Sequence, residues 1–288
     1  MAQRTSLPWS RRAWCSAMVG LSAGALGSLS GCAASPVTVA APSHTLNDAD
    51  RQALAAADYV LLGEQHDASE HHALEAACSE WLAKQGQLGA LVLEMADAGS
   101  QTLGLETTAG EAQVRQALAW QNDAWPWEHY APAIMAAVRA GVPVYGGNLP
   151  RSEMKAAMNN TALSERVPFG AWRELQRAVD EGHCGLLPER RWAPMARIQI
   201  AKDLSLARTL TQTHVRDRTS LLLCGSAHAS RLLGVPLHLN PSQRTLSVHL
   251  RAANGAKAGT GAFDLEWVTA PTPERDYCAE LKAQWGKH

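Results

Sequence analysis

The stretch YVLLGEQH (residues 59–66) is an apolar run that stops at a glycine and is followed at once by polar side chains. A short apolar run bounded by a turn signal is typical of a strand that is buried on both faces. The same pattern occurs in ALVLEMAD (residues 90–97), VPVYGGN (142–148) and SLLLCGSAH (220–228), and the segments between these runs have helical periodicity. Together they predict an α/β fold, with a mostly parallel sheet flanked by helices.

The chain between the third and fourth runs is too long for a simple crossover and carries little strand signal. We therefore expect a smaller helical insert subdomain at residues 149–216, with helices at 171–182 and 194–210. The α/β domain then comprises residues 46–148 and 217–282. Three later segments, VPLHL (235–239), TLSVHL (245–250) and FDLEWV (263–268), are predicted to be strands.

The segment after the first run predicts a helix with an apolar stripe made of Leu74, Ala77, Cys78, Trp81 and Leu82. His71 falls on this stripe and should face the sheet, whereas His72 falls off it and should face solvent. Asp67 and Glu70 have the spacing of a capping pair at the start of the helix.

The N-terminus has the pattern of an export signal, because Arg11 and Arg12 precede an uncharged apolar run with small residues at its end. The sequence Leu-Ser-Gly-Cys (residues 29–32) resembles a bacterial lipobox, which implies that residues 1–31 are removed and that Cys32 is lipidated. An uncleaved transmembrane helix is the alternative, although the run is short for a span. Residues 32–45 would be a flexible tether. We expect a protein that is anchored in the cell envelope, at the outer membrane facing the periplasm.

The net charge and the cysteine content narrow the classes of function that the sequence allows. Loss of residues 1–31 removes three arginines and no acid, so the formal net charge changes from −1 to −4, and no basic block remains that would indicate nucleic acid binding. Cys78 and Cys224 lie in apolar contexts and are predicted to be buried thiols. Cys184 and Cys278 lie in polar, loop-like contexts and are the expected disulfide pair, which an exported compartment permits. The absence of Cys-x-x-Cys-His excludes covalent c-type haem attachment.

Polar side chains follow each of the four apolar runs. Glu64 and His66 follow the first run, Glu94 ends the second, Asn148 ends the third and His228 follows the fourth. Because ligands bind beyond the carboxyl ends of the strands in open parallel sheets, we expect a functional site where these side chains converge.

Two Gly-x-x-His turns, at residues 63–66 and 225–228, together with Glu94 resemble the superfamily of ChaN-type haem-binding lipoproteins, erythromycin-esterase-like enzymes and Tiki/TraB proteins. The ChaN branch is most similar, because WPWEHYAPAI, VPVYGGNLPR, GHCGLLPE, QIAKD, GSAHASRLLGVP and RDYC follow in its order. The resemblance implies non-covalent haem binding linked to iron uptake, with a homodimer and an outer-membrane haem receptor as further partners to consider. The sequence departs from the family pattern at three places, Ala227, Ala229-Ser230 and Lys202. These differences put the identity of the ligand in question more than the fold, because less positive charge would weaken contacts to haem propionates.

The resemblance also suggests which residues would serve haem. Tyrosine and histidine are usual axial ligands, so Tyr130, His66 and His183 are the candidates, and the tryptophans beside Tyr130 would line an apolar slot. The alternative is that this aromatic run is a core anchor. Arg151 and Lys202 would contact the propionates, and Glu64, Glu94 and His228 complete the predicted haem-binding set.

Two other functions use the same residues differently. In a metal-dependent hydrolase or protease, Glu64, His66, Glu94 and His228 would bind a divalent metal that activates water, or would work without metal, with Glu64 or His66 as base. The chain contains neither a His-Glu-x-x-His helix nor a Gly-x-Ser-x-Gly elbow. A lipoprotein that only binds a protein partner is the third reading. We expect a haem-binding protein without enzymatic activity.

Overall fold

The computed structural model describes residues 43–285, so the expected export signal and the lipidation site at Cys32 lie outside the described residues. Within the described range, no helix combines the length and the apolar character needed to cross a membrane.

The described chain forms an α/β fold around one six-stranded sheet whose ladders are all parallel. Its strand order is β3-β2-β4-β1-β5-β6. The strands are β1 (Tyr59–Glu64), β2 (Leu88–Asp97), β3 (Val144–Asn148), β4 (Thr219–Gly225), β5 (Thr245–Ala252) and β6 (Leu265–Thr269). The four apolar runs thus form β1 to β4, as predicted. In the register of β1 with β4, Glu64 is the partner of Gly225, so the two Gly-x-x-His turns leave the sheet at the same level.

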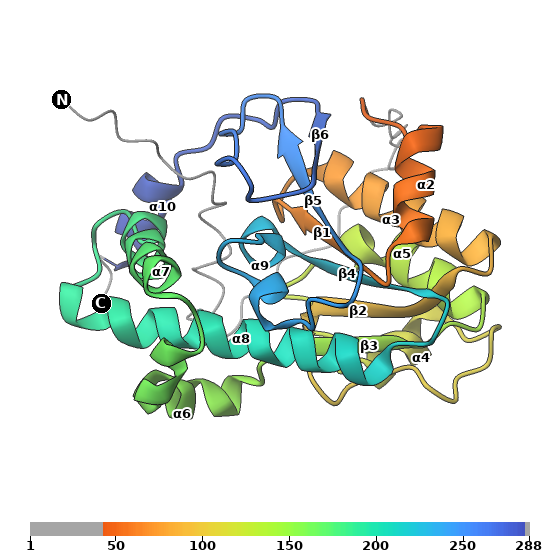
Figure 1. The fold of residues 1–288 in the computed structure, drawn as a ribbon, viewed down its shortest axis with the longest axis horizontal. Coiled ribbons are helices and arrows are strands. Elements are labelled where there is room, and N and C mark those ends of the chain that lie inside the picture. Colours follow the sequence, from red (N-terminus) through yellow and green to blue (C-terminus); the bar gives the residue numbers. More distant parts are fainter. Residues whose placement is uncertain (1–42, 286–288) are drawn as a thin grey trace, which may run out of the picture.

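Helices cover both faces of the sheet (Figure 1). The elements of the α/β part are α2 (Asp48–Ala56), α3 (Ser69–Lys84), α4 (Glu111–Ala117), α5 (Trp127–Arg139), α9 (Ser226–Ala229), η4 (Val235–His238) and α10 (Tyr277–Trp285). Residues of α3 and α5 share a core with one face of β4, including Leu221 and Leu223. The other face, including Leu222 and Cys224, packs against the long helix α8 (Trp192–Thr213). The alternation along β4 buries both faces and explains why its sequence is continuously apolar.

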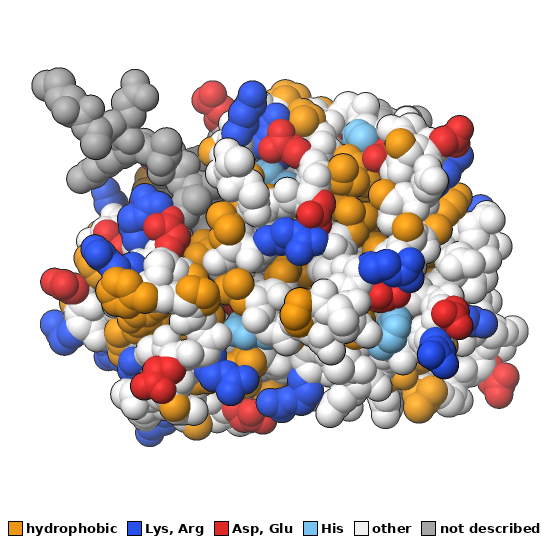
Figure 2. All heavy atoms as spheres, in the orientation of Figure 1, with side chains coloured by type: hydrophobic (Ala, Val, Ile, Leu, Met, Phe, Trp, Pro, Cys, Tyr) orange, Lys and Arg blue, Asp and Glu red, His pale blue; other side chains and the backbone are white. Residues whose placement is uncertain are grey.

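The segment between β3 and β4 is helical. It contains η1 (Arg151–Glu153), α6 (Met154–Asn159), η2 (Thr161–Glu165), α7 (Phe169–Gly182), η3 (Glu189–Arg191) and α8. These elements bury an apolar cluster of their own, which includes Leu175, Val179 and Ile200. Helix α8 runs along the molecule, with α6 and α7 at one end and β2 and β3 at the other (Figure 1). On the face in Figure 2, hydrophobic side chains gather over α7 and toward α9.

Three local predictions were wrong. His72 is buried, because α3 packs against α5 as well as against the sheet, so a second side of the helix is covered. Asp67 and Glu70 do not form a capping pair: Asp67 accepts hydrogen bonds from Gln65 and Tyr277, and Glu70 accepts hydrogen bonds from Ser43 and from the backbone of Ala270. The segment VPLHL forms the 3-10 helix η4 instead of a strand.

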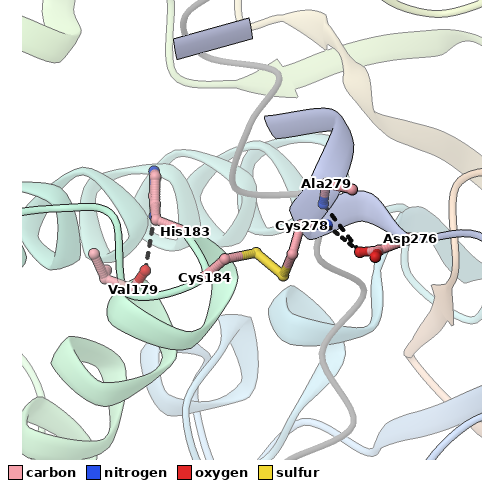
Figure 3. Close-up of a disulfide and its surroundings, with 6 residues drawn as sticks. All are labelled: Val179, His183, Cys184, Asp276, Cys278 and Ala279. Carbon is pink, nitrogen blue, oxygen red and sulfur yellow. Dashed lines mark hydrogen bonds between the residues drawn. A yellow bond between two sulfur atoms is a disulfide. The ribbon is translucent and has the colours of Figure 1, made fainter. Parts of the chain in front are cut away.

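A disulfide joins Cys184, directly after α7, to Cys278 in α10 (Figure 3). The two cysteines are 94 residues apart in sequence. Within the described residues, Cys78 and Cys224 are free and buried, as expected from their apolar contexts. The disulfide therefore holds the C-terminal helix α10 against the helical segment between β3 and β4, although the two are far apart in sequence.

The Cys184→Ser/Cys278→Ser double variant should have a free energy of unfolding about 2–5 kcal/mol lower than the oxidised wild type, because the cross-link closes a long loop in the unfolded chain. Urea unfolding followed by circular dichroism measures this difference. The reduced wild type should match the variant. Equal urea midpoints for the variant and the oxidised wild type would contradict the expected stabilisation.

Candidate functional site

The carboxylate of Glu64 is fully buried at the end of β1, where two side chains donate hydrogen bonds to it and a third, His72, lies within ion-pair distance. His66 Nδ1 donates to Glu64 Oε1 over 2.7 Å, and the Tyr130 hydroxyl donates to the same oxygen over 2.8 Å. His72 Nε2 lies 3.0 Å from the other oxygen, Oε2. The strand end, α3 and α5 therefore meet at one carboxylate.

A second buried carboxylate, that of Glu94 on β2, organises the neighbouring strand ends. It accepts a hydrogen bond of 2.8 Å from the backbone N–H of Gly225, and its Oε1 lies 3.2 Å from His228 Nε2. Lys202 on α8 places its ammonium 3.8 Å from the same oxygen. On its other side, the ring of His228 donates from Nδ1 to Asp203 over 2.6 Å. The two carboxylate groups meet at His66, whose Nε2 lies 3.9 Å from Glu94 Oε2.

The glycines of the two Gly-x-x-His turns leave room for this arrangement. A Cβ at Gly225 would lie 2.9 Å from His66 Nε2, and one at Gly63 would lie 2.9 Å from the Cα of Ser226. Real Cβ contacts are essentially never this short, so any larger residue would push the turns apart. The motif glycines thus allow the backbone of α9 and the ring of His66 to approach the sheet.

We define the acid–histidine cluster as Glu64, His66, His72, Glu94, Tyr130, Lys202, Asp203 and His228. Burial alone would raise the pKa values of Glu64 and Glu94, but the neighbouring histidines, together with Lys202 at Glu94, lower both far below the usual range. Burial alone would lower the pKa of His66, and Glu64 and Glu94 raise it instead. For His228, the charges of Glu94 and Asp203 outweigh burial and raise the pKa to about 10. The carboxylates and imidazolium groups therefore compensate one another inside the protein.

Tyr130 and Glu75 hold their protons in this environment. Burial, followed by the negative charge of Glu64, raises the pKa of Tyr130 well above its ordinary value. Burial and the charge of Glu64 raise the pKa of Glu75 in the same way. Among the described residues, neither carboxyl oxygen of Glu75 has a hydrogen-bond partner, which also favours the neutral acid. Both side chains are thus neutral at the centre of the fold.

The same arrangement bears on the metal-dependent alternative. An imidazolium has no lone pair for a metal ion, and the raised pKa values of His66 and His228 favour that form. Within residues 43–285, no group of three or more His, Cys, Asp or Glu side chains has the geometry to hold a metal ion. In this state the cluster is a charge-compensated network of buried side chains.

The structure brings five of the seven predicted haem-binding residues into this cluster and leaves two outside. Glu64, His66, Glu94, Tyr130 and His228 lie together. Arg151 is exposed on η1. His183 is buried beside the disulfide (Figure 3), where its Nδ1 lies 2.7 Å from the carbonyl oxygen of Val179 and its ring packs against Trp285.

The aromatic run around Tyr130 packs into the core. Trp127 and Tyr130 are buried there with Trp120, and the ring of Trp125 meets that of His66 edge to face at 4.8 Å. This arrangement corresponds to the alternative in which the aromatic run anchors the core, because the rings pack against one another. Lys202 is buried against Glu94 rather than presented at the surface. The ligand and propionate roles of these residues stay predictions.

Two members of the cluster were not found from the sequence. His72 was expected in solvent, and Asp203 was not singled out. For Asp203 the only signal is its place beside Lys202 within QIAKD, where two charges interrupt an otherwise apolar stretch of α8.

An apolar cavity of about 450 Å³ opens beside the acid–histidine cluster. Its walls are the start of α7, the segment from α9 to η4, and the loop between β5 and β6. Ser226 links the two sites, because it lines the cavity and directly follows Gly225, whose N–H donates to Glu94. Two large hydrophobic side chains are exposed nearby, Phe169 at 74% and Leu232 at 49% of their surfaces.

The fold and the family of this chain are shown by comparisons with known proteins. The family model for haem-binding uptake proteins of the Tiki superfamily, ChaN, matches residues 51–239. The structure is similar to that of ChaN of Campylobacter jejuni, described for its cofacial haem binding, with a TM-score of 0.63, 24% identity, and coverage of 79% of this chain and 93% of that chain.

Two further structures are more distant. A protein from Bacillus cereus gives a TM-score of 0.44 at 14% identity, covering 82% of this chain and 76% of that chain. The structure of the type III effector HopBA1 gives a TM-score of 0.41 at 15% identity, covering 77% of this chain and 91% of that chain. No curated protein matches the chain significantly.

His228 should make the stability of the protein depend on pH in one window. Its pKa rises from 6.5 to about 10 on folding, so its stabilising contribution is complete below pH 6.5 and is lost as the pH rises toward 10. Urea unfolding between pH 6 and 10 should show a steeper fall for wild type than for His228→Gln. His183→Gln is the control, because burial lowers the pKa of His183 and this gives no loss above pH 6.5. Parallel pH profiles for wild type and His228→Gln would contradict the assignment.

Proposed function

Since the chain belongs to the haem-binding uptake family of the Tiki superfamily, ChaN, we propose that it is a lipid-anchored haem-binding protein of the cell envelope that takes part in haem and iron uptake. The match of the family model over residues 51–239 supports the haem-binding part of this proposal, because it spans all four apolar runs and the helical segment.

The chemistry of the residues present fits a haem in one respect and restricts it in another. A porphyrin needs a flat apolar slot. The cavity beside α9 has mainly apolar walls, and its volume is in the usual range for a small-molecule site. A tyrosinate ligand is disfavoured at Tyr130, because its pKa is raised and its hydroxyl already donates to Glu64. Bound haem would supply its iron centre and conjugated ring, and this chain would contribute the apolar walls that shield them from water.

Lipid anchoring and envelope location rest on the sequence alone. The run of small and apolar residues ending at Leu-Ser-Gly-Cys (residues 29–32) supports cleavage before Cys32 and acylation of its thiol. An outer-membrane haem receptor and a second copy of the chain are the partners that we propose for delivery and exchange of haem.

Haemin titration of the full mature chain should give saturable binding with a shifted Soret band. The variants Tyr130→Phe, His66→Ala and His183→Ala should each keep the affinity within about twofold, roughly 0.4 kcal/mol, because all three side chains are buried in contacts within the protein. Circular dichroism of each variant checks its folding. A folded wild type that shows no Soret shift would sink the haem proposal, whereas loss of the shift in one folded variant would identify that residue as the axial ligand.

Replacement of Cys32 by serine should release the protein from the membrane fraction, because a serine hydroxyl does not accept the thioether-linked lipid. Fractionation of cells that express the wild type or the Cys32→Ser variant, with labelled palmitate as a readout, measures this. Cys78→Ser is the matched control, since Cys78 is a buried thiol of the folded domain. Equal membrane association and labelling of the wild type and Cys32→Ser would contradict lipid anchoring at this residue.

A further inference from the structure

The C-terminal helix α10 is attached to the rest of the fold by the Cys184–Cys278 disulfide and by little buried surface. We infer that this disulfide is a site of reversible reduction by a dithiol, and that its reduction releases α10 from the helical segment and from the turn that carries His66. The inference concerns a further chemical modification of the protein and does not depend on haem binding.

Helix α10 contributes little to the hydrophobic core. Leu281 is its one buried residue, although the helix is nine residues long. The free energy gained by burying one leucine is several-fold smaller than the conformational entropy cost of ordering nine residues. Asp276 accepts hydrogen bonds from the backbone N–H groups of Cys278 and Ala279 (Figure 3), but these contacts stabilise the helix itself and do not attach it to the fold. The position of α10 therefore depends on the cross-link.

The backbone at Cys184 is held in an unfavourable conformation. Its φ is +57°, in the left-handed region that residues other than glycine rarely adopt, and Gly185 follows with a φ of +69°. A non-glycine residue persists in this region only where the surrounding structure fixes it. The bond to Cys278 is one such restraint, so reduction allows the end of α7 to relax as α10 leaves.

The disulfide lies where a dithiol can approach it. Cys184 and Cys278 are both partly exposed, whereas the free thiols of Cys78 and Cys224 are buried. A dithiol attacks one sulfur as its thiolate, forms a mixed disulfide with the protein, and then closes its own disulfide. Two electrons pass from the dithiol to the protein, and each of the two released cysteine sulfurs takes up one proton. An oxidised dithiol or a second disulfide reverses the reaction.

The release of α10 reaches the turn that follows β1. Tyr277, which precedes Cys278, donates a hydrogen bond from its hydroxyl to Asp67. Asp67 directly follows His66 in this turn and also accepts a hydrogen bond of 2.9 Å from the Gln65 side chain. Displacement of α10 breaks the contact with Tyr277, so the segment that positions His66 loses a restraint and opens more often.

The other end of α10 covers His183. The ring of Trp285 lies 6.2 Å from that of His183, measured between their centroids, and His183 is only 2% exposed. His183 directly precedes Cys184 (Figure 3), so the cross-link and the covering ring act on the same corner of the molecule. Reduction therefore exposes the imidazole of His183 together with the turn after β1.

Amide hydrogen exchange of the full mature chain, followed by mass spectrometry, tests this release. We expect dithiothreitol to lower the protection of residues 277–285 by at least about tenfold and to lower that of residues 64–68, while the buried strand β4 stays protected. The Cys184→Ser/Cys278→Ser variant should exchange like the reduced wild type with or without dithiothreitol. Modification of His183 by diethyl pyrocarbonate should increase in the reduced protein and in this variant.

A second variant separates the contact with the turn from the cross-link. In the oxidised protein, Tyr277→Phe should leave residues 277–285 protected and still lower the protection of residues 64–68, because it removes only the hydroxyl that donates to Asp67. Tyr145→Phe is the matched control, since Tyr145 belongs to β3, outside both segments. This control should exchange like the wild type at residues 64–68.

Each other outcome overturns a defined part of the inference. If thiol counting shows that dithiothreitol leaves the disulfide intact in the folded protein, it is not a reducible site. If reduction leaves α10 protected, the disulfide is not what holds the helix. If β4 loses its protection together with α10, reduction unfolds the whole domain and a local release is wrong. If residues 64–68 stay protected in the reduced protein and in Tyr277→Phe, the helix does not restrain the turn.

Discussion

A carboxylate buried at the end of the first strand sets the arrangement of everything around it. Glu64 has no exposed surface, and an unpaired charge in that position would destabilise the fold by several kcal/mol. Its compensation comes from three elements, through His66 in the β1 turn, His72 on α3 and Tyr130 on α5. These short contacts tie the β1 turn and the two helices to one point at the edge of the sheet.

Glu94 applies the same constraint to the other half of the sheet edge. It joins β2 to the backbone of Gly225 after β4, to Lys202 on α8 and to His228 on α9. Asp203 completes the set from the neighbouring position of α8. The two carboxylate groups share His66, so helices on opposite faces of the sheet are electrostatically linked through its carboxyl edge. Such a network specifies one packing because each partner is needed to neutralise another.

Much of this could be predicted from the sequence, because the signals were local. The apolar runs located β1 to β4, and the carboxyl-edge rule brought Glu64, His66, Glu94 and His228 together. The contributions of His72 and Asp203 depend instead on which helix packs on which. The periodicity of α3 shows one apolar stripe, whereas the fold covers a second side with α5. The strand prediction for VPLHL failed for a different, local reason: Pro236 within it cannot donate a hydrogen bond to a sheet ladder.

The motif residues and the apolar cavity are built from different kinds of residue, and this division has a physical basis. Polar residues at strand ends produce recognisable motifs, because their chemistry and spacing are both restricted by burial. Apolar walls such as Leu233, Leu237 and Phe263 come from distant segments and have no spacing in common. The rigid cluster holds the Gly225 backbone through Glu94, and the cavity wall starts at the next residue. A charge-compensated network can therefore shape a neighbouring apolar cavity, by holding the backbone from which one wall of that cavity is built.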